Sequence, residues 1–136
     1  MRHLFGVILL TSIALGVVAG CGGGGGKGPT GKVSGVVTFD GQPVTVGSVR
    51  LYNPKSASTG SGSIKEAGKF TLDAPVPVGS YKVSVVPPQE PPPEMGKPYE
   101  PKKYDNIPDK YRSELTTDIT AEIKAGDNEI KVEMKK

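Results

Sequence analysis

From Lys32 onward the chain consists of short segments in which apolar and polar residues alternate, each ending at a cluster of Gly, Pro, Asn or Asp. Alternation with a period of two places successive side chains on opposite faces of a β-strand, and the clusters are typical of turns. The 19 Gly and 13 Pro residues leave little uninterrupted sequence for long helices. The sequence therefore predicts seven strands, over residues 33–39, 48–52, 63–65, 70–72, 78–86, 119–123 and 129–134.

The segments between these strands carry their own predictions. Residues 66–69 favour a hairpin that joins 63–65 to 70–72, and residues 55–62 read as a polar loop of small side chains. The last two segments contain Glu, Lys and Ala and so resemble helix in composition. Their strict alternation about the turn at 124–128 favours strands instead.

Seven strands with short turns predict an all-β fold, a single seven-stranded Greek-key β-sandwich of the transthyretin-like or Ig-like type over residues 32–136. A domain of this size buries enough apolar surface for one modest core. Gly35 leaves the strand parity around Val36 and Val37 open, because glycine in a strand can mark a bulge. The expected core comprises Val33, Val36, Phe39, Val49, Leu51, Ile64, Phe70, Leu72, Tyr81, Val83, Val85, Leu115, Ile119, Ile123, Ile130, Val132 and Met134.

The first twenty residues differ from the rest. A short basic start, Met1-Arg2-His3, precedes sixteen uncharged residues from Leu4 to Ala19, and small residues follow. This order predicts a signal peptide over residues 1–20. A membrane-spanning helix is the alternative; it ranks second because the stretch is near the lower length limit, contains several glycines, and has no basic cluster after it.

The residues Val18-Ala19-Gly20-Cys21 resemble the lipobox of bacterial lipoproteins. The resemblance implies cleavage between Gly20 and Cys21 and acylation of the Cys21 thiol, so that the partner of this end of the chain is the membrane. Two or three acyl chains hold a protein stably at a bilayer where one would not. Gly22 occupies the position where an Asp often retains such proteins at the inner membrane, which implies export with the outer membrane favoured.

Residues 21–31 are predicted to be a flexible tether that carries the acylated Cys21. Five consecutive glycines, Gly22 to Gly26, recover too little energy to be ordered. A phosphate-binding loop is rejected, because no strand precedes the glycines and no Gly-Lys-Ser/Thr pattern closes them.

The spacing Val33-x-Gly35-x-Val37, Asp40-Gly41-x-Pro43 and Gly68-x-Phe70-x-Leu72 resembles the carboxypeptidase regulatory-like domain, a transthyretin-like sandwich. The resemblance continues through Pro77-x-Gly79-x-Tyr81 and covers most of residues 32–136. It implies a non-catalytic accessory module for adhesion, stability or carbohydrate contact. A fold alone does not establish a function.

Catalysis is not expected. His3, the one histidine, lies in the signal peptide, so the mature chain lacks the usual general base for nucleophilic and hydrolytic sites. Tyr111-Arg112-Ser113 is similar to the Tyr-Arg-Gly-Ser motif of hydroxyisourate hydrolase but lacks its Gly. Asp105-Asn106 and Asp127-Asn128-Glu129 do not match a calcium loop, and turn chemistry explains them better. No catalytic residue, metal site or cofactor is predicted. With 17 basic against 14 acidic residues, no nucleic-acid partner is expected either.

Residues 87–108 form a Pro-rich insertion with eight prolines in 22 positions, which favours polyproline II over helix or central strand. An ordered crossover between strands is the favoured interpretation. Loops on a rigid scaffold often carry function, so this insertion is also the candidate binding segment for an envelope glycan or protein partner. The candidate binding residues are Tyr99, Lys102, Lys103 and Tyr104. Together these features predict a lipid-anchored structural or binding accessory module; the alternatives are a carbohydrate-binding module and a subunit of an envelope complex.

Overall fold

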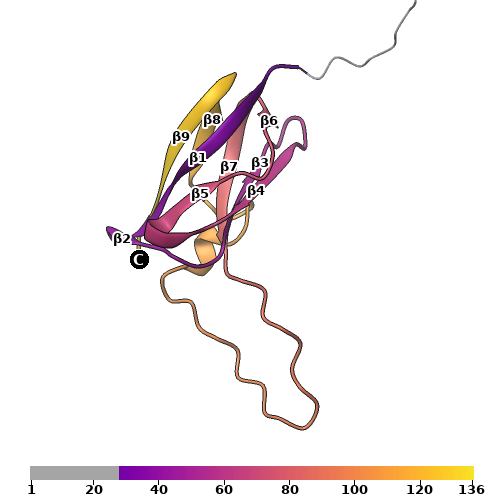
Figure 1. The fold of residues 1–136 in the computed structure, drawn as a ribbon, viewed down its shortest axis with the longest axis vertical. Helices are drawn as coiled ribbons and strands as arrows, with labels where there is room; N and C mark the ends of the chain where they lie inside the picture. Colours follow the sequence, from indigo (N-terminus) through magenta and orange to yellow (C-terminus); the bar gives the residue numbers. More distant parts are fainter. Residues whose placement is uncertain (1–27) are drawn as a thin grey trace, which may run out of the picture.

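The computed structural model describes residues 28–136, which form two β-sheets packed face to face (Figure 1). The fold is an all-β sandwich, as predicted, with nine strands in place of seven. No helix within residues 28–136 is long and apolar enough to cross a membrane. One sheet holds β1 (Thr30–Phe39), β2 (Gln42–Pro43), β5 (Lys69–Thr71), β6 (Val76–Pro77) and β9 (Gly126–Met134). The other holds β3 (Ser48–Tyr52), β4 (Thr59–Ser63), β7 (Gly79–Val86) and β8 (Thr120–Ile123).

β1 organises the first sheet. Along one edge it pairs in parallel with β9, from Gly31 opposite Gly126 to Phe39 opposite Met134. Along its other edge β6, β5 and β2 pair antiparallel in turn. The second sheet is wholly antiparallel, in the order β4-β3-β7-β8. Two short 3₁₀ turns, η1 (Glu66–Gly68) and η2 (Asp109–Tyr111), complete the regular structure.

The strand predictions were wrong at β4, which occupies part of the segment predicted to be a polar loop. Its sequence Thr-Gly-Ser-Gly-Ser carries no apolar signal, yet its glycines are required by close packing. A Cβ at Gly60 would lie 2.6 Å from Val76 Cγ1, and one at Gly62 would lie 2.1 Å from the Thr71 carbonyl oxygen. Small residues therefore mark a close approach between the two sheets in place of a loop.

The predicted hairpin around 66–69 is only partly present. Ile64 and Phe70 form one isolated bridge, but β4 pairs with β3 and β5 pairs with β1. The turn at η1 therefore carries the chain from one sheet to the other. Similarly, β8 and β9 alternate about a turn but lie in different sheets.

β1 begins at Thr30, two residues before the predicted start of the domain. Thr30 and Gly31 pair with Pro77 and Val76 of β6, and Gly31 is buried against the Lys124 carbonyl. These pairings remove 30 and 31 from the predicted tether. Residues 21–27 lie outside the described part of the chain, as do Gly20 and the signal peptide.

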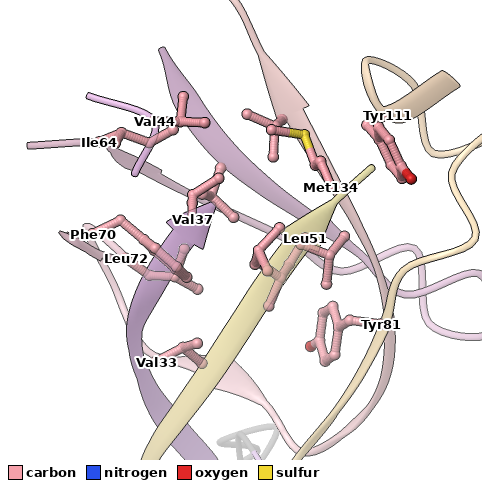
Figure 2. Close-up of a cluster of buried hydrophobic side chains, with 14 of the residues drawn as sticks. Val33, Val37, Val44, Leu51, Ile64, Phe70, Leu72, Tyr81, Tyr111 and Met134 are labelled. Atoms are coloured by element: carbon pink, nitrogen blue, oxygen red, sulfur yellow. The ribbon is translucent and has the colours of Figure 1, made fainter. Parts of the chain in front are cut away.

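The core lies between the sheets, with Leu51, Tyr81 and Met134 among its largest buried side chains (Figure 2). Most of the predicted core residues are buried there. The buried hydrophobic residues are Val33, Val37, Val44, Val49, Leu51, Ile64, Phe70, Leu72, Val76, Tyr81, Val83, Val85, Ile107, Tyr111, Ile123, Val132 and Met134. Phe39, Ile119 and Ile130 are partly buried against this cluster.

Two predicted core residues were wrong. Val36 does not face the core, because the alternation runs through Gly35 without a bulge and buries Val33, Gly35 and Val37. Leu115 is 88% exposed, in the turn before β8. Ile107 and Tyr111 of the preceding segment are buried in the core instead.

Tyr81 anchors the end of the sandwich at which β1 begins. Its ring is buried and its hydroxyl donates to the Pro77 carbonyl at 2.7 Å. Burial raises the pKa of this hydroxyl above its ordinary value. Nearby, the buried Asn53 side chain accepts from the backbone N–H groups of Lys55 and Ser56, at 2.9 and 3.2 Å, and so shapes the β3–β4 turn.

Candidate functional site

The most prominent feature outside the sandwich is the proline-rich arm, residues 87–108. It leaves the sandwich where β7 ends and projects from the end opposite Thr30 (Figure 1). Residues 91–103 are exposed without exception. Five of these thirteen residues are prolines, which have no N–H for strand pairing. The segment 91–103 is therefore extended but forms no β-strand.

The two limbs of the arm are joined through Glu90. Its carboxylate accepts a hydrogen bond from the Tyr99 hydroxyl at 2.7 Å and one from the Lys102 backbone N–H at 2.8 Å. At the tip, Glu94 and Lys97 form an ion pair at 2.5 Å, and Gly96 adopts a φ of +86°. The Tyr99 hydrogen bond lowers the pKa of Glu90, and the same bond raises the pKa of Tyr99.

The base of the arm is fixed by Arg112. Its guanidinium donates to the Ile107 carbonyl at 2.8 Å and to the Tyr104 carbonyl at 3.2 Å, and it pairs with Asp109 at 2.9 Å. Ile107 itself is fully buried in the core. The arm is therefore held rigidly where it joins the sandwich.

A groove of about 890 Å³ lies between the limbs, with Val46 of the sandwich contributing to its wall. Of the four predicted binding residues, Tyr99, Lys102 and Tyr104 line this groove and Lys103 does not. Tyr99 is 51% exposed, whereas Tyr104 packs against the core. The arm thus brings three of the predicted residues together, but it offers Tyr99 alone as a freely exposed aromatic ring.

Replacing Glu90 by Ala is expected to loosen the arm without affecting the sandwich. Because the Lys102 N–H then loses its acceptor, its hydrogen exchange should become several-fold faster, while amides of β7 keep their protection. Glu100→Ala, on the same limb as Tyr99, is the matched control. Unchanged exchange at Lys102 in the Glu90 variant would show that this carboxylate does not organise the arm.

The same linkage predicts a pH dependence. The folded-state pKa of Glu90 is lowered, so its contribution is present above the ordinary carboxyl pKa and is lost as the pH falls through the lowered value. The ring resonances of Tyr99 should follow this acid titration in the wild-type protein and be free of it in Glu90→Ala.

The residues considered above for catalysis and for calcium binding make contacts that stabilise the fold. Tyr111 is buried, and its hydroxyl accepts from the Lys135 N–H at 3.2 Å. The Asn128 side chain accepts from the Lys124 N–H at 2.9 Å and donates to the Lys124 and Lys32 carbonyls at 2.8 and 3.2 Å, which ties the β8–β9 turn to β1. Within residues 28–136 no group of three or more His, Cys, Asp or Glu side chains is placed to hold a metal ion.

A second cleft, of about 510 Å³, was missed by the sequence analysis. It lies over β3 and β4 and is lined by Arg50, Tyr52, Ser61 and Ser84, with Asp73 and Glu114 among the other lining residues. The available signal was the set of polar residues at alternate positions of the predicted strands 48–52 and 78–86.

Comparison with known proteins gives no family assignment. No family model matches the chain, and no curated protein matches it. Among solved structures, a DUF3823 family protein from Parabacteroides merdae is similar, with 17% sequence identity and a TM-score of 0.45 over 78% of this chain. The chain spans 46% of the length of that protein.

Proposed function

We propose that the protein is a lipid-anchored, non-catalytic accessory protein of the bacterial cell envelope, held in the membrane by acylated Cys21. The observation that carries the proposal is the lipobox-like sequence that ends at Cys21. The sequence places the lipobox-like Cys21 nine residues before Thr30, and the arm leaves the sandwich at the opposite end. An anchor at one end would present the arm away from the lipid surface.

The structural surroundings of Tyr111 and Arg112 support a non-catalytic role. Tyr111 is buried in the core, and Arg112 is occupied by the backbone at the base of the arm. Neither side chain is free to act on a substrate. The two-sheet fold is also consistent with the resemblance to carboxypeptidase regulatory-like domains. We propose the outer membrane as the location because Gly22, and not an Asp, follows Cys21.

The anchor is tested by the intact mass of protein extracted from membranes, beside a Cys21→Ala variant fractionated in parallel. We expect the wild-type mass to equal residues 21–136 plus acyl chains, and we expect the variant to leave the membrane fraction or mislocalise. Gly22→Ala, which leaves Cys21 in place, is the control and should stay acylated. An uncleaved, unacylated wild-type chain would instead mean that the first segment is a membrane helix.

Two versions of the accessory role differ in their partner. An envelope-complex subunit should yield a specific crosslinked partner through Lys102 or Lys103 on the exposed limb of the arm. A carbohydrate-binding module that acts through the arm should bind envelope glycans and lose that binding in Tyr99→Ala, since Tyr99 supplies the exposed ring. The two outcomes separate the alternatives.

A further inference from the structure

We infer that the free edge of β9 is a docking site for an extended segment of another protein, in which basic and apolar residues alternate. Such a segment would join the first sheet as a further antiparallel strand, held by its backbone and selected by its side chains. Figure 1 shows β9 at the edge of this sheet, with β1 as its one neighbour. The site involves neither the arm nor Cys21, so the inference goes beyond the proposed function.

The backbone of β9 turns alternately toward β1 and toward the free edge. Met134 lies opposite Phe39, and its carbonyl accepts from the Asp40 N–H at 3.0 Å, so the backbone groups of Met134 face β1. Every second residue before Met134 faces β1 in the same way, because the N–H and C=O groups of successive strand residues point to opposite sides. The residues whose backbone groups face the free edge are therefore Asp127, Glu129, Lys131 and Glu133.

These edge-facing backbone groups have no partner within residues 28–136. β9 pairs with β1 alone, and none of the other hydrogen bonds of this region uses an N–H or C=O of the four residues. The free row ends at Lys135, whose N–H donates to the Tyr111 hydroxyl at 3.2 Å. The edge of β4 differs, because its Ser61 carbonyl already accepts from the Asp73 N–H at 2.8 Å. β9 therefore offers backbone donors and acceptors to a further strand.

β9 lacks several features with which edge strands commonly avoid pairing. Prolines, bulges and inward-facing charges are among these features. The ladder between β1 and β9 runs through nine consecutive residue pairs, and the sequence of β9 contains no proline. Its core-facing residues Val132 and Met134 are apolar and buried. The edge is thus long and regular enough to accept a strand.

The outward-facing charges of β9 select the partner. Asp127, Glu129 and Glu133 are exposed acids, and Lys131 is the one base among them. Opposite charges on directly opposed strand residues stabilise the pairing. An added strand therefore fits best with basic residues opposite the three carboxylates and an acidic residue opposite Lys131. Its other side chains lie beside half-buried Ile130, which favours apolar residues at the positions between.

A second copy of β9 fits this edge poorly. In an antiparallel pair centred on Lys131, the two lysines face each other and Glu129 faces Glu133. A pair centred one residue earlier sets Asp127 against Glu133. Like charges directly opposite each other destabilise a strand pair. A pair centred one residue later runs on to Lys135, whose N–H is already hydrogen-bonded. The occupant that the edge favours is therefore a different chain.

The test is an NMR titration of the isotope-labelled full chain in detergent micelles with the synthetic heptapeptide KVEVKVK. We expect a Kd of about 1 mM or tighter, with the shifts centred on the amides of Glu129 and Lys131. N-methylation of the four charged residues of the peptide should abolish binding, because their N–H groups would face β9. N-methylation of its three valines, whose N–H groups would face away, should be tolerated.

Glu129→Lys should weaken binding of the peptide roughly fivefold, because one attractive pair across the strands becomes repulsive. Glu100→Lys is the matched control, since it makes the same change of net charge at an exposed position of the arm. Thermal unfolding verifies that each variant is folded. The inference is overturned if KVEVKVK does not bind, if the two methylated peptides behave alike, or if Glu100→Lys weakens binding as much as Glu129→Lys.

Sedimentation equilibrium of the wild-type chain tests the remaining occupant. We expect a monomer. A dimer that KVEVKVK dissociates would assign the edge to a second copy and would also overturn the inference. None of these results depends on acylation of Cys21, so a failure here leaves the proposed anchor standing.

Discussion

Gly35→Ala is expected to destabilise the sandwich strongly. A Cβ at this position would lie 2.0 Å from the Ile130 carbonyl oxygen and 2.9 Å from Phe70 Cε1. The oxygen belongs to β9, so the β1–β9 ladder itself would have to shift. We expect a loss of about 3 kcal/mol in the free energy of unfolding, seen as a fall in melting temperature on the order of 10 °C.

Gly28→Ala is the control for this prediction. A Cβ at Gly28 meets no atom within 4 Å, so the variant should unfold within about 0.5 kcal/mol of the wild-type protein. If Gly35→Ala melted together with Gly28→Ala, the close approach of β1 and β9 at Gly35 would be contradicted.

Ile107→Ala should have an effect of similar size, although Ile107 belongs to the proline-rich arm. Its side chain is fully buried in the core, and truncating a buried Ile to Ala costs about 2–5 kcal/mol through lost burial and the cavity left behind. The base of the arm should loosen as well, because Ile107 fixes the limb that Arg112 holds. Chemical denaturation gives the first effect, and hydrogen exchange at the base of the arm gives the second.

Leu115→Ala is the control, because it removes the same number of carbon atoms as Ile107→Ala. Leu115 is 88% exposed, so we expect a change within about 0.5 kcal/mol. An equal loss of unfolding free energy in Leu115→Ala and Ile107→Ala would mean that Leu115 is buried, as the sequence analysis predicted.

Strand alternation identified most of the fold. Where a strand is covered on one face, as at Tyr81, Val83 and Val85, the period of two gives the buried face directly. It failed at Val36 because Gly35, which precedes the adjacent valines Val36 and Val37, left either parity open. It failed at β4 because that strand contains no apolar residue, and its glycines are required by close contacts with Val76 and Thr71. A pattern of apolar residues cannot report a close approach of backbones.

The candidate surfaces were harder to predict. The Pro-rich composition located the arm and three residues of its groove. It could not reveal Glu90 as the link between the limbs, because that role depends on two partners nine and twelve residues away. The cleft at Arg50 depends on register between three strands, which alternation within single strands does not specify.

The parallel pairing of β1 with β9 also sets the order in which the domain can fold. Gly31 and Gly126, the first partners in that ladder, are separated by 95 residues of chain. Contacts between distant segments are formed late and slow a chain's folding, because loop-closure entropy is lost before they form. The second sheet, whose strands neighbour one another more closely in sequence, can assemble earlier. β1 then completes the sandwich only after β9 has been synthesised, so a nascent chain that still lacks β9 stays open.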